Sequence, residues 1–325
     1  MNELTLLYRG PLSSCNYACA YCPFAKRREN RRQLEYDRSC LVRFLEWARA
    51  QHNWHLRVFF TPWGEALVRR YYREAIVELC RLPQIEKVVV QTNLSAPLAF
   101  ASQCGDKLAI WATFHPDWAD PKRFLAQCRR LDQAQVAYSV GVVGFARFRK
   151  AILELRQRLA PSVYLWINAV KAQLDELAEE DRRFFSHIDP LYELNTQAYA
   201  SRGRPCGGGS RVVSVDGEGM LRTCHFQSQP LGNLYDRQWW TALRPRLCLT
   251  DHCRCYIGYV HLEYLQMNRV FGSGILERIP SGRAPFQIKE VVVQSHSLAP
   301  MEALENHAHH LFSSGQPVLP DLAGQ

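Results

Sequence analysis

Three cysteines close to the N-terminus, Cys15, Cys19 and Cys22, have the spacing C-x3-C-x2-C. This spacing lets three thiolates converge on one metal centre at a small cost in loop entropy. A zinc site would need a fourth ligand nearby, and the surrounding sequence offers none. A four-iron cluster held by three thiolates keeps one iron open to a cofactor or substrate. We therefore interpret the three cysteines as catalytic ligands of such a cluster, with zinc and inert buried thiols as the alternatives.

A second group of cysteines lies within residues 206–255. Its members are Cys206, Cys224, Cys248, Cys253 and Cys255. Four thiolates are enough to hold either an iron–sulfur cluster or a structural zinc ion. The sequence therefore predicts a second metal centre here and leaves open which metal it holds; a group without metal is a third alternative.

Strand-like and helix-like segments alternate over the first 185 residues and must position the first cysteine group. Apolar runs typical of strands occupy Leu4–Tyr8, Leu56–Phe60, Lys87–Gln91, Leu108–Phe114, Val136–Val143 and Val163–Val170. Segments with helical spacing of apolar residues are Cys40–Ala50, Leu67–Leu82, Pro121–Leu131, Phe148–Leu159 and Gln173–Phe185. This alternation predicts an α/β fold with a parallel sheet and right-handed crossovers. The first cysteine group then follows a strand, at the carboxyl edge where such folds have their active sites.

Six strand–helix units are fewer than the eight that close a full barrel, so a partial barrel and an open sheet both fit the pattern.

After about residue 195 the alternation stops. Two short runs, Val212–Val215 and Met220–Thr223, flank Asp216–Gly219 and predict a β-hairpin. From about residue 290 the chain is polar and ends in a tail that we expect to be loosely ordered.

The composition is that of an ordinary globular protein. Apolar residues make up 47% and charged residues 22%, which excludes collagen-like, mucin-like and largely disordered classes. No apolar run approaches the roughly 18 residues of a membrane span, and the first residues lack the pattern of a secretory signal. We therefore expect a cytoplasmic protein without a membrane partner, in which the 12 cysteines do not form a disulfide framework.

The formal charge of +9 hints at an anionic partner. Part of this charge lies in Lys26–Arg28, Arg31 and Arg32. This run is either a solvated loop and helix face or a patch that attracts an acidic or phosphorylated substrate.

At this point the chain resembles the radical S-adenosylmethionine (radical SAM) enzymes. Residues 15–22 match the C-x3-C-x-aromatic-C signature, with Tyr21 before the third cysteine. Thr61–Leu67 is similar to the family's Gly-Gly-Glu-Pro segment, in which Gly64 and Glu65 are retained while Trp63 and Ala66 replace the first glycine and the proline. The resemblance covers roughly residues 1–190 and implies a partial (β/α)6 TIM-like barrel of a bacterial subfamily.

The resemblance also implies which residues contact S-adenosylmethionine (SAM). The segment with Gly64 and Glu65 would bind the amino group of its methionine, and Tyr21 would lie near the adenine. The other implied cofactor-lining residues are Asn93, Gly141, Val143 and Asn168. Each of these four has an ordinary alternative role as a turn, cap or packing residue. The chemistry implied is reductive cleavage of SAM to a 5′-deoxyadenosyl radical that abstracts hydrogen from a substrate, with a flavodoxin or ferredoxin as electron donor.

The second cysteine group resembles the auxiliary-cluster domains called SPASM and twitch. These begin with a cysteine, a hairpin and a G-x4-C element, as do Cys206 and Gly219–Cys224 here. The resemblance implies a second [4Fe-4S] cluster held by Cys206, Cys224, Cys253 and Cys255, although the C-x-C spacing of the last pair departs from the usual C-x2-C. Cys248 is the alternative ligand, which could replace either Cys253 or Cys255. The implied domains are a core over 1–195, an auxiliary domain over 196–290 and a tail over 291–325.

The expected substrate is a peptide or a small metabolite. A second candidate is modification of a nucleotide or RNA, for which the sequence has no recognisable RNA-binding module, so we expect no nucleic-acid partner. A third is a non-catalytic iron–sulfur electron carrier. Residues without an assigned role are Cys40, Cys80, Cys104 and Cys128, His115, the tail residues His307, His309 and His310, and the pair Trp239 and Trp240, which we expect to pack.

Overall fold

The computed structural model describes residues 2–25 and 27–281. Its centre is a nine-stranded sheet with the order β11-β10-β9-β1-β2-β3-β4-β5-β6. Six of these strands are parallel neighbours: β1 (Asn2–Arg9), β2 (Trp54–Phe60), β3 (Ile85–Thr92), β4 (Leu108–Phe114), β5 (Ala137–Val143) and β6 (Leu165–Asn168). The predicted α/β fold with a large parallel sheet is confirmed.

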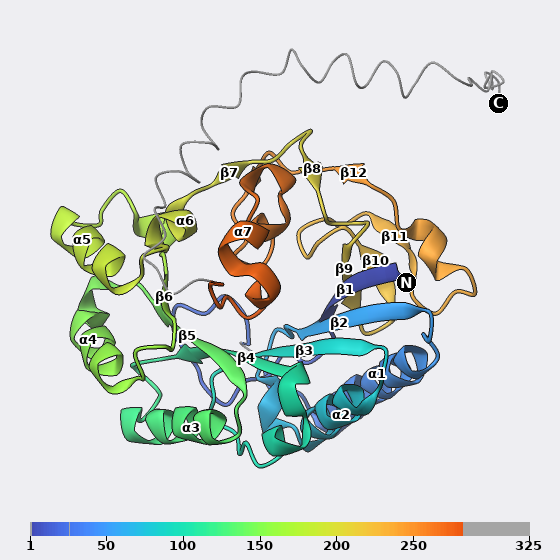
Figure 1. The fold of residues 1–325 in the computed structure, drawn as a ribbon, viewed down its shortest axis with the longest axis horizontal. Coiled ribbons are helices and arrows are strands. Elements are labelled where there is room, and N and C mark those ends of the chain that lie inside the picture. The colour runs from blue at the N-terminus through green and yellow to red at the C-terminus, as the bar shows by residue number, and fades with distance from the viewer. Residues whose placement is uncertain (1, 26, 282–325) are drawn as a thin grey trace. The chain divides into compact units, whose positions relative to one another are not determined.

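Helices follow these strands and cover one side of the sheet, whereas a short helix, α7, lies on the opposite side (Figure 1). The helices are α1 (Arg31–Arg49), α2 (Arg70–Arg81), α3 (Pro121–Gln133), α4 (Arg149–Arg158), α5 (Glu179–Ile188), α6 (Tyr192–Thr196) and α7 (Asn268–Phe271). In the described ranges no helix is long and apolar enough to span a membrane.

Two helices differ from the prediction by more than three residues at their first residue. Helix α1 begins nine residues earlier than expected, because Asn30 and Gln33 form a capping box in which each side chain accepts the other's backbone N–H. Helix α5 begins at Glu179, so the helix predicted from Gln173 was wrong over its first turn and a half. Three acidic residues in the first turn stabilise this later start.

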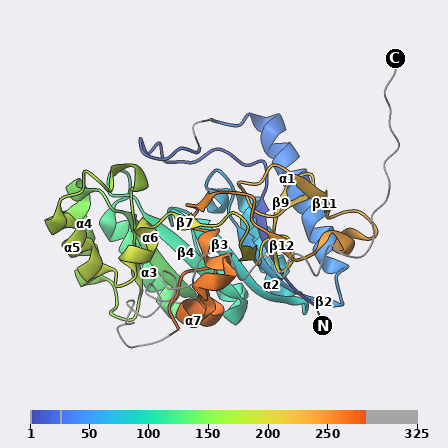
Figure 2. The same ribbon diagram turned by 90° about the horizontal axis from the view of Figure 1, so that it is seen from above.

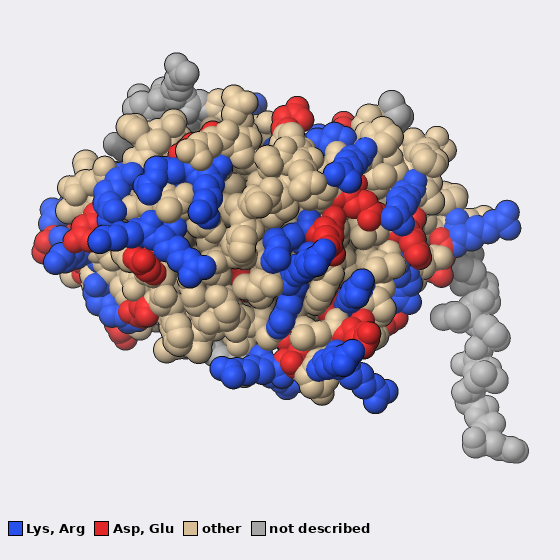
Figure 3. Space-filling view, turned by 90° about the horizontal axis from the view of Figure 1, so that it is seen from below, with Lys and Arg blue, Asp and Glu red and all other residues tan. Residues whose placement is uncertain are grey.

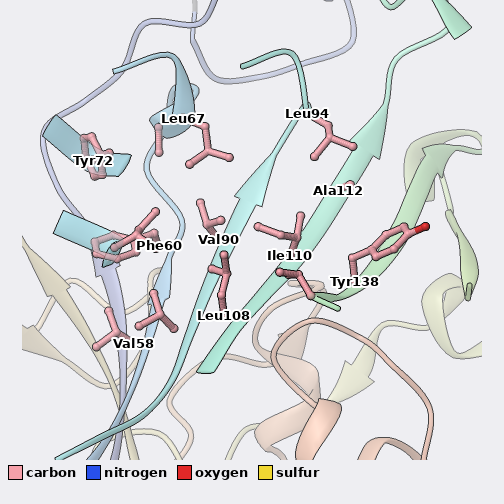
Figure 4. Packing of buried hydrophobic residues seen from close by; sticks show 14 of the residues in the cluster. Val58, Phe60, Leu67, Tyr72, Val90, Leu94, Leu108, Ile110, Ala112 and Tyr138 are labelled. Carbon is pink, nitrogen blue, oxygen red and sulfur yellow. The ribbon is translucent and has the colours of Figure 1, made fainter. Parts of the chain in front are cut away.

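Both faces of the parallel sheet are buried, which explains the unbroken apolar runs of its strands. Toward the helices, side chains such as Val58, Phe60 and Ile110 form the main core (Figure 4). The alternate side chains, among them Phe59 and Trp111, pack on the other face against the C-terminal part of the described chain, which contributes Ile257 and Leu276 to the same cluster. The second half of the chain therefore closes over the sheet of the first half.

The predicted hairpin is confirmed and extends the main sheet. Strand β9 (Val212–Asp216) pairs in parallel with β1, while β10 (Met220–Arg222) and β11 (Pro230–Asn233) continue antiparallel. Figure 2 shows β9 and β11 beside α1 at one end of the sheet, with α4 and α5 at the other. The sheet thus runs across the domain boundary expected near residue 195, within one compact unit.

Two small ladders hold the segments that carry the second cysteine group. Strand β7 (Tyr199–Ala200) pairs with β13 (His252–Cys253), and β8 (Pro205–Cys206) pairs with β12 (Arg246–Leu247). Each of these strands has two residues. They bring Cys206 and Cys253 to the side of the sheet on which the C-terminal segment packs.

Basic side chains do not form one continuous patch on the face drawn in Figure 3, where acidic and uncharged residues separate several groups of Lys and Arg. Some are paired, as Arg49 is with Glu78 at 2.6 Å. In the basic run Arg27, Arg28, Arg31 and Arg32 are exposed. Lys26, the expected tail after residue 290 and its three histidines lie outside the described residues.

Candidate functional site

A cavity of about 360 Å³ lies at the carboxyl ends of the parallel strands, and we call it the first cavity. Every parallel strand of the core contributes to it, either through its last residues or through the loop that follows. Its lining includes Arg9, Cys15, Tyr21, Cys22, Trp63, Gly64, Glu65, Asn93, His115, Val143, Asn168 and Tyr256. Two of the three first-group cysteines and most of the predicted cofactor residues therefore lie around one space.

The chain that leads into the first cysteine group is fastened by two carboxylates. Asp37 on α1 is buried and accepts a hydrogen bond from the Leu12 backbone N–H at 3.0 Å. Glu29 accepts from the Ser13 hydroxyl at 2.7 Å and from the Ser14 backbone N–H at 2.8 Å. Because both acceptors belong to α1 or its approach, the helix fixes where the cysteine loop starts.

Cys15 accepts two hydrogen bonds at its sulfur, but its surroundings as a whole disfavour a thiolate. Its Sγ lies 3.3 Å from the backbone N of Tyr17 and 3.6 Å from Nδ2 of Asn93, both of which donate to it. Burial, together with the neighbouring Glu65 and the other first-group cysteines, raises the pKa of Cys15 to about 11. A bound metal group would be needed to hold this sulfur deprotonated at neutral pH.

Glu65 connects the loop after β2 to the end of β3. Its carboxylate is buried and accepts from the Thr92 hydroxyl at 2.7 Å, from the Leu67 backbone N–H at 3.1 Å and from the Asn93 backbone N–H at 2.6 Å. Burial raises the pKa of Glu65, and these hydrogen bonds oppose that effect. With both oxygens occupied, Glu65 acts as a positioning residue for Asn93 and thereby for Cys15.

Gly64 is required by a close approach between two loops. Its backbone N–H donates to the Leu12 carbonyl at 3.2 Å, and that of Glu65 donates to the Ser14 carbonyl at 2.9 Å. A Cβ on Gly64 would lie 2.0 Å from the Ser14 oxygen. Only glycine allows the loop after β2 to pair with the cysteine loop in this way.

The residues predicted on β5 and β6 divide into two groups. Val143 and Asn168 line the first cavity, and Oδ1 of Asn168 is buried without a hydrogen-bond partner among the described residues. Gly141 lies away from that lining. A Cβ on it would meet the Trp166 indole nitrogen at 2.2 Å, so this glycine makes room for a tryptophan.

Tyr21 is held by His115, a residue to which the sequence assigned no role. Its hydroxyl lies 2.8 Å from Nδ1 of His115, and its ring packs against Phe145. Burial lowers the pKa of His115 to about 4, so the imidazole is neutral at pH 7. His115 therefore both lines the first cavity and fixes the aromatic residue of the cysteine signature.

All five second-group cysteines line another cavity of about 320 Å³, which we call the second cavity. Burial and the nearby Cys255, Cys248 and Cys206 raise the pKa of Cys224 to about 11. In the described ranges, no three His, Cys, Asp or Glu side chains stand close enough to bind a single ion as they are. A donor set made of sulfur suits either zinc or an iron–sulfur cluster.

The two cavities are neighbours. Cys255 lines the second cavity, and the next residue, Tyr256, lines the first. His225 also lines the second cavity, and its Nε2 lies 3.2 Å from the hydroxyl of Thr61, which directly precedes the loop at the first cavity. A thin wall of side chains therefore separates the two cysteine groups.

The four unassigned cysteines are buried in the helix-side layers, as expected for structural thiols. Cys104, which has no partner by sequence spacing, donates to the Phe100 carbonyl at 3.6 Å and lies near Cys80 on α2. Trp239 is buried and packs edge-on against Trp47, whereas Trp240 is exposed. The prediction that this pair packs is therefore confirmed for Trp239.

Sequence reasoning overlooked Arg9, Tyr256 and His225. Arg9 ends the first strand, so the rule that located Asn93 at a strand end would have found it as well. Tyr256 and His225 reach the cavities only because the second half of the chain folds back onto the sheet, and no local pattern marks that event.

No protein-family model and no curated protein matches the chain. Solved structures to which it is similar include native anSMEcpe with bound AdoMet, with 14% identity over 74% of this chain and 80% of that chain and a TM-score of 0.49. Native anSMEcpe with bound AdoMet and Kp18Cys peptide has 13% identity over 74% and 80%, with a TM-score of 0.49. BtrN in complex with AdoMet and 2-DOIA has 16% identity over 72% and 80%, with a TM-score of 0.33. At TM-scores below 0.5 we base the function on the chain's own residues.

Proposed function

We propose that the chain is a radical SAM enzyme that holds a [4Fe-4S] cluster with Cys15, Cys19 and Cys22 and binds S-adenosylmethionine in the first cavity. The observation that carries this proposal is the convergence of the cysteine loop and the ends of six parallel strands on one space. When bound, the cluster and SAM would supply a carbon-centred radical able to abstract hydrogen from a peptide or small metabolite.

The chain's own residues fit these groups. Thiols are the ligands that iron–sulfur clusters require, and Cys15 already accepts two hydrogen bonds at its sulfur. Asn168 brings a buried oxygen that has no partner in the described part of the chain and could accept from a hydroxyl or amino group of the cofactor. Tyr21, fixed by His115, offers an aromatic face at the same cavity.

Anaerobic reconstitution tests this proposal. The reconstituted protein should form 5′-deoxyadenosine from SAM after reduction, and Cys19→Ala should lower that rate at least 100-fold. Cys128→Ala is the matched control, because it removes another buried cysteine, on α3, from a layer away from both cavities. Bound iron without any SAM cleavage in the wild type would instead favour the non-catalytic electron carrier.

We further propose that the second cavity holds an auxiliary [4Fe-4S] cluster bound by Cys206, Cys224, Cys253 and Cys255. The support is that all four, with Cys248, line one cavity beside the first. Iron should therefore approach about eight atoms per chain, and about four should remain when the three first-group cysteines are changed to alanine. Cys248→Ser should keep those four irons and Cys253→Ser should lose them. Retention of zinc in place of iron would contradict this assignment.

The remaining parts of the proposal are the partners. A flavodoxin or ferredoxin is the proposed electron donor. A peptide or small metabolite is favoured over RNA as substrate, because the sequence has no recognisable RNA-binding module.

A further inference from the structure

The first cavity contains Arg9, a half-buried cation without an ion pair among the described residues. Arg9 is the last residue of β1, and its guanidinium carbon lies 3.9 Å from the ring centroid of Trp63. Its Nε is buried without a hydrogen-bond partner, and within residues 2–25 and 27–281 the guanidinium has neither hydrogen bond nor ion pair. A partly desolvated charge without an ion pair is unfavourable for folding, so its presence points to a ligand.

The carboxylate that lines the first cavity does not supply that counter-charge. Glu65 is the acidic side chain in the lining of the first cavity, and three donors from its own loop and from the end of β3 already occupy its two oxygens. His115 is neutral because burial lowers its pKa to about 4. Burial lowers the pKa of Arg9 to about 10 and the nearby Cys255 thiol opposes that effect, so Arg9 is still a cation at neutral pH.

The geometry of Arg9 suits a planar or tetrahedral anion. Its guanidinium stacks on the Trp63 indole, and Phe24 packs against the same indole with ring centroids 4.6 Å apart. Stacking fixes the plane of the guanidinium and leaves its N–H edge available, which is the arrangement that binds carboxylate or phosphate through two parallel hydrogen bonds.

We propose that Arg9 binds an anionic group, a carboxylate or a phosphate, of the substrate that enters the first cavity. This inference rests on the proposed function for the identity of the cavity and deepens it by assigning an acidic class of substrate. The formal charge of the chain hinted at such a partner without locating a residue that would bind it.

Thermal unfolding of the anaerobically reconstituted full chain tests the proposal, with inorganic phosphate and acetate as probes at constant ionic strength. Either anion should raise the Tm of the wild type, because a ligand that binds the folded state stabilises it. In Arg9→Met the affinity deduced from that shift should fall at least tenfold, while the Tm without anion should rise. Arg147→Met is the control, since Arg147 also stacks on an aromatic ring, Phe145, and has Asp117 as a counter-charge at 3.3 Å.

Two results would overturn the proposal. One is an equal response to the anions in the wild type and Arg9→Met. The other is a loss of SAM affinity in Arg9→Met as large as the loss of anion affinity, which would assign Arg9 to the carboxylate of SAM. The anion titration needs neither SAM nor an electron, so a wild type that binds anions through Arg9 but never cleaves SAM would overturn the proposed function and leave Arg9 as an anion-binding residue.

Discussion

The two cysteine groups are built in opposite ways. The first takes its three cysteines from eight consecutive residues, and carboxylates of Asp37, Glu29 and Glu65 fix the surrounding loops through hydrogen bonds. The second gathers cysteines spread over residues 206–255, partly on strands of only two residues. We infer that the chain itself organises the first cavity, whereas the second depends more on the group it binds.

The largest expected effect separates the two groups by function. Cys22→Ser should abolish SAM cleavage, with a fall of at least 100-fold, and should leave the second centre's iron in place. Cys224→Ser should remove about four irons and retain more than a tenth of the SAM cleavage measured without substrate, because the first group has its own ligands. Iron analysis and quantification of 5′-deoxyadenosine measure both effects. Equal losses of SAM cleavage in Cys22→Ser and Cys224→Ser would show that the first group does not function without the second.

A smaller effect tests the preorganisation of the first cavity. Gly64→Ala places a Cβ against the Ser14 carbonyl, so the paired loops must separate or shift. We expect the free energy of unfolding to fall by about 3 kcal/mol, as measured by urea denaturation, and SAM affinity to fall with it. The control is Gly207→Ala in the second region, where the nearest atom would be 3.7 Å away. A Gly64→Ala protein as stable as the Gly207→Ala control would contradict the inference that the chain itself organises the first cavity.

The smallest expected effect concerns a buried carboxyl group beside β6, the strand that contributes Asn168 to the first cavity. Asp189 is buried and accepts hydrogen bonds from the Ile167 and Leu191 backbone N–H groups at 2.8 Å. Burial raises its pKa from 3.8 to about 6. A raised folded-state pKa of a carboxyl group gives stability that is present below pH 3.8 and lost as the pH rises through 6.

Relative to Asp189→Asn, the wild type should therefore lose about 2 kcal/mol of unfolding free energy between pH 4.5 and pH 7. Urea denaturation of both proteins across this range measures the difference. A constant difference would mean that the folded-state pKa is not raised, and a difference of opposite sign would mean that hydrogen bonding to the carboxylate outweighs burial.

The sequence was most informative where chemistry and local structure coincide. The apolar runs located all six parallel strands, and the C-x3-C-x2-C spacing marked three residues that the fold brings to the strand ends. The sequence was least informative where contacts between distant segments decide which residues line a cavity. Gly141 has the right strand and register for a cavity residue, yet Trp166 occupies the space beside it. Tyr256 and His225 became neighbours of the first cavity only through the return of the chain across the sheet.

The parallel pairing of β9 with β1 has a consequence for biosynthesis. Strand β1 is made first, but one of its two neighbours in the sheet is completed only at Asp216. During translation the edge of β1 stays open until more than half of the chain has left the ribosome, and open edges invite pairing with other chains. We therefore expect that nascent chains stopped near residue 195 aggregate.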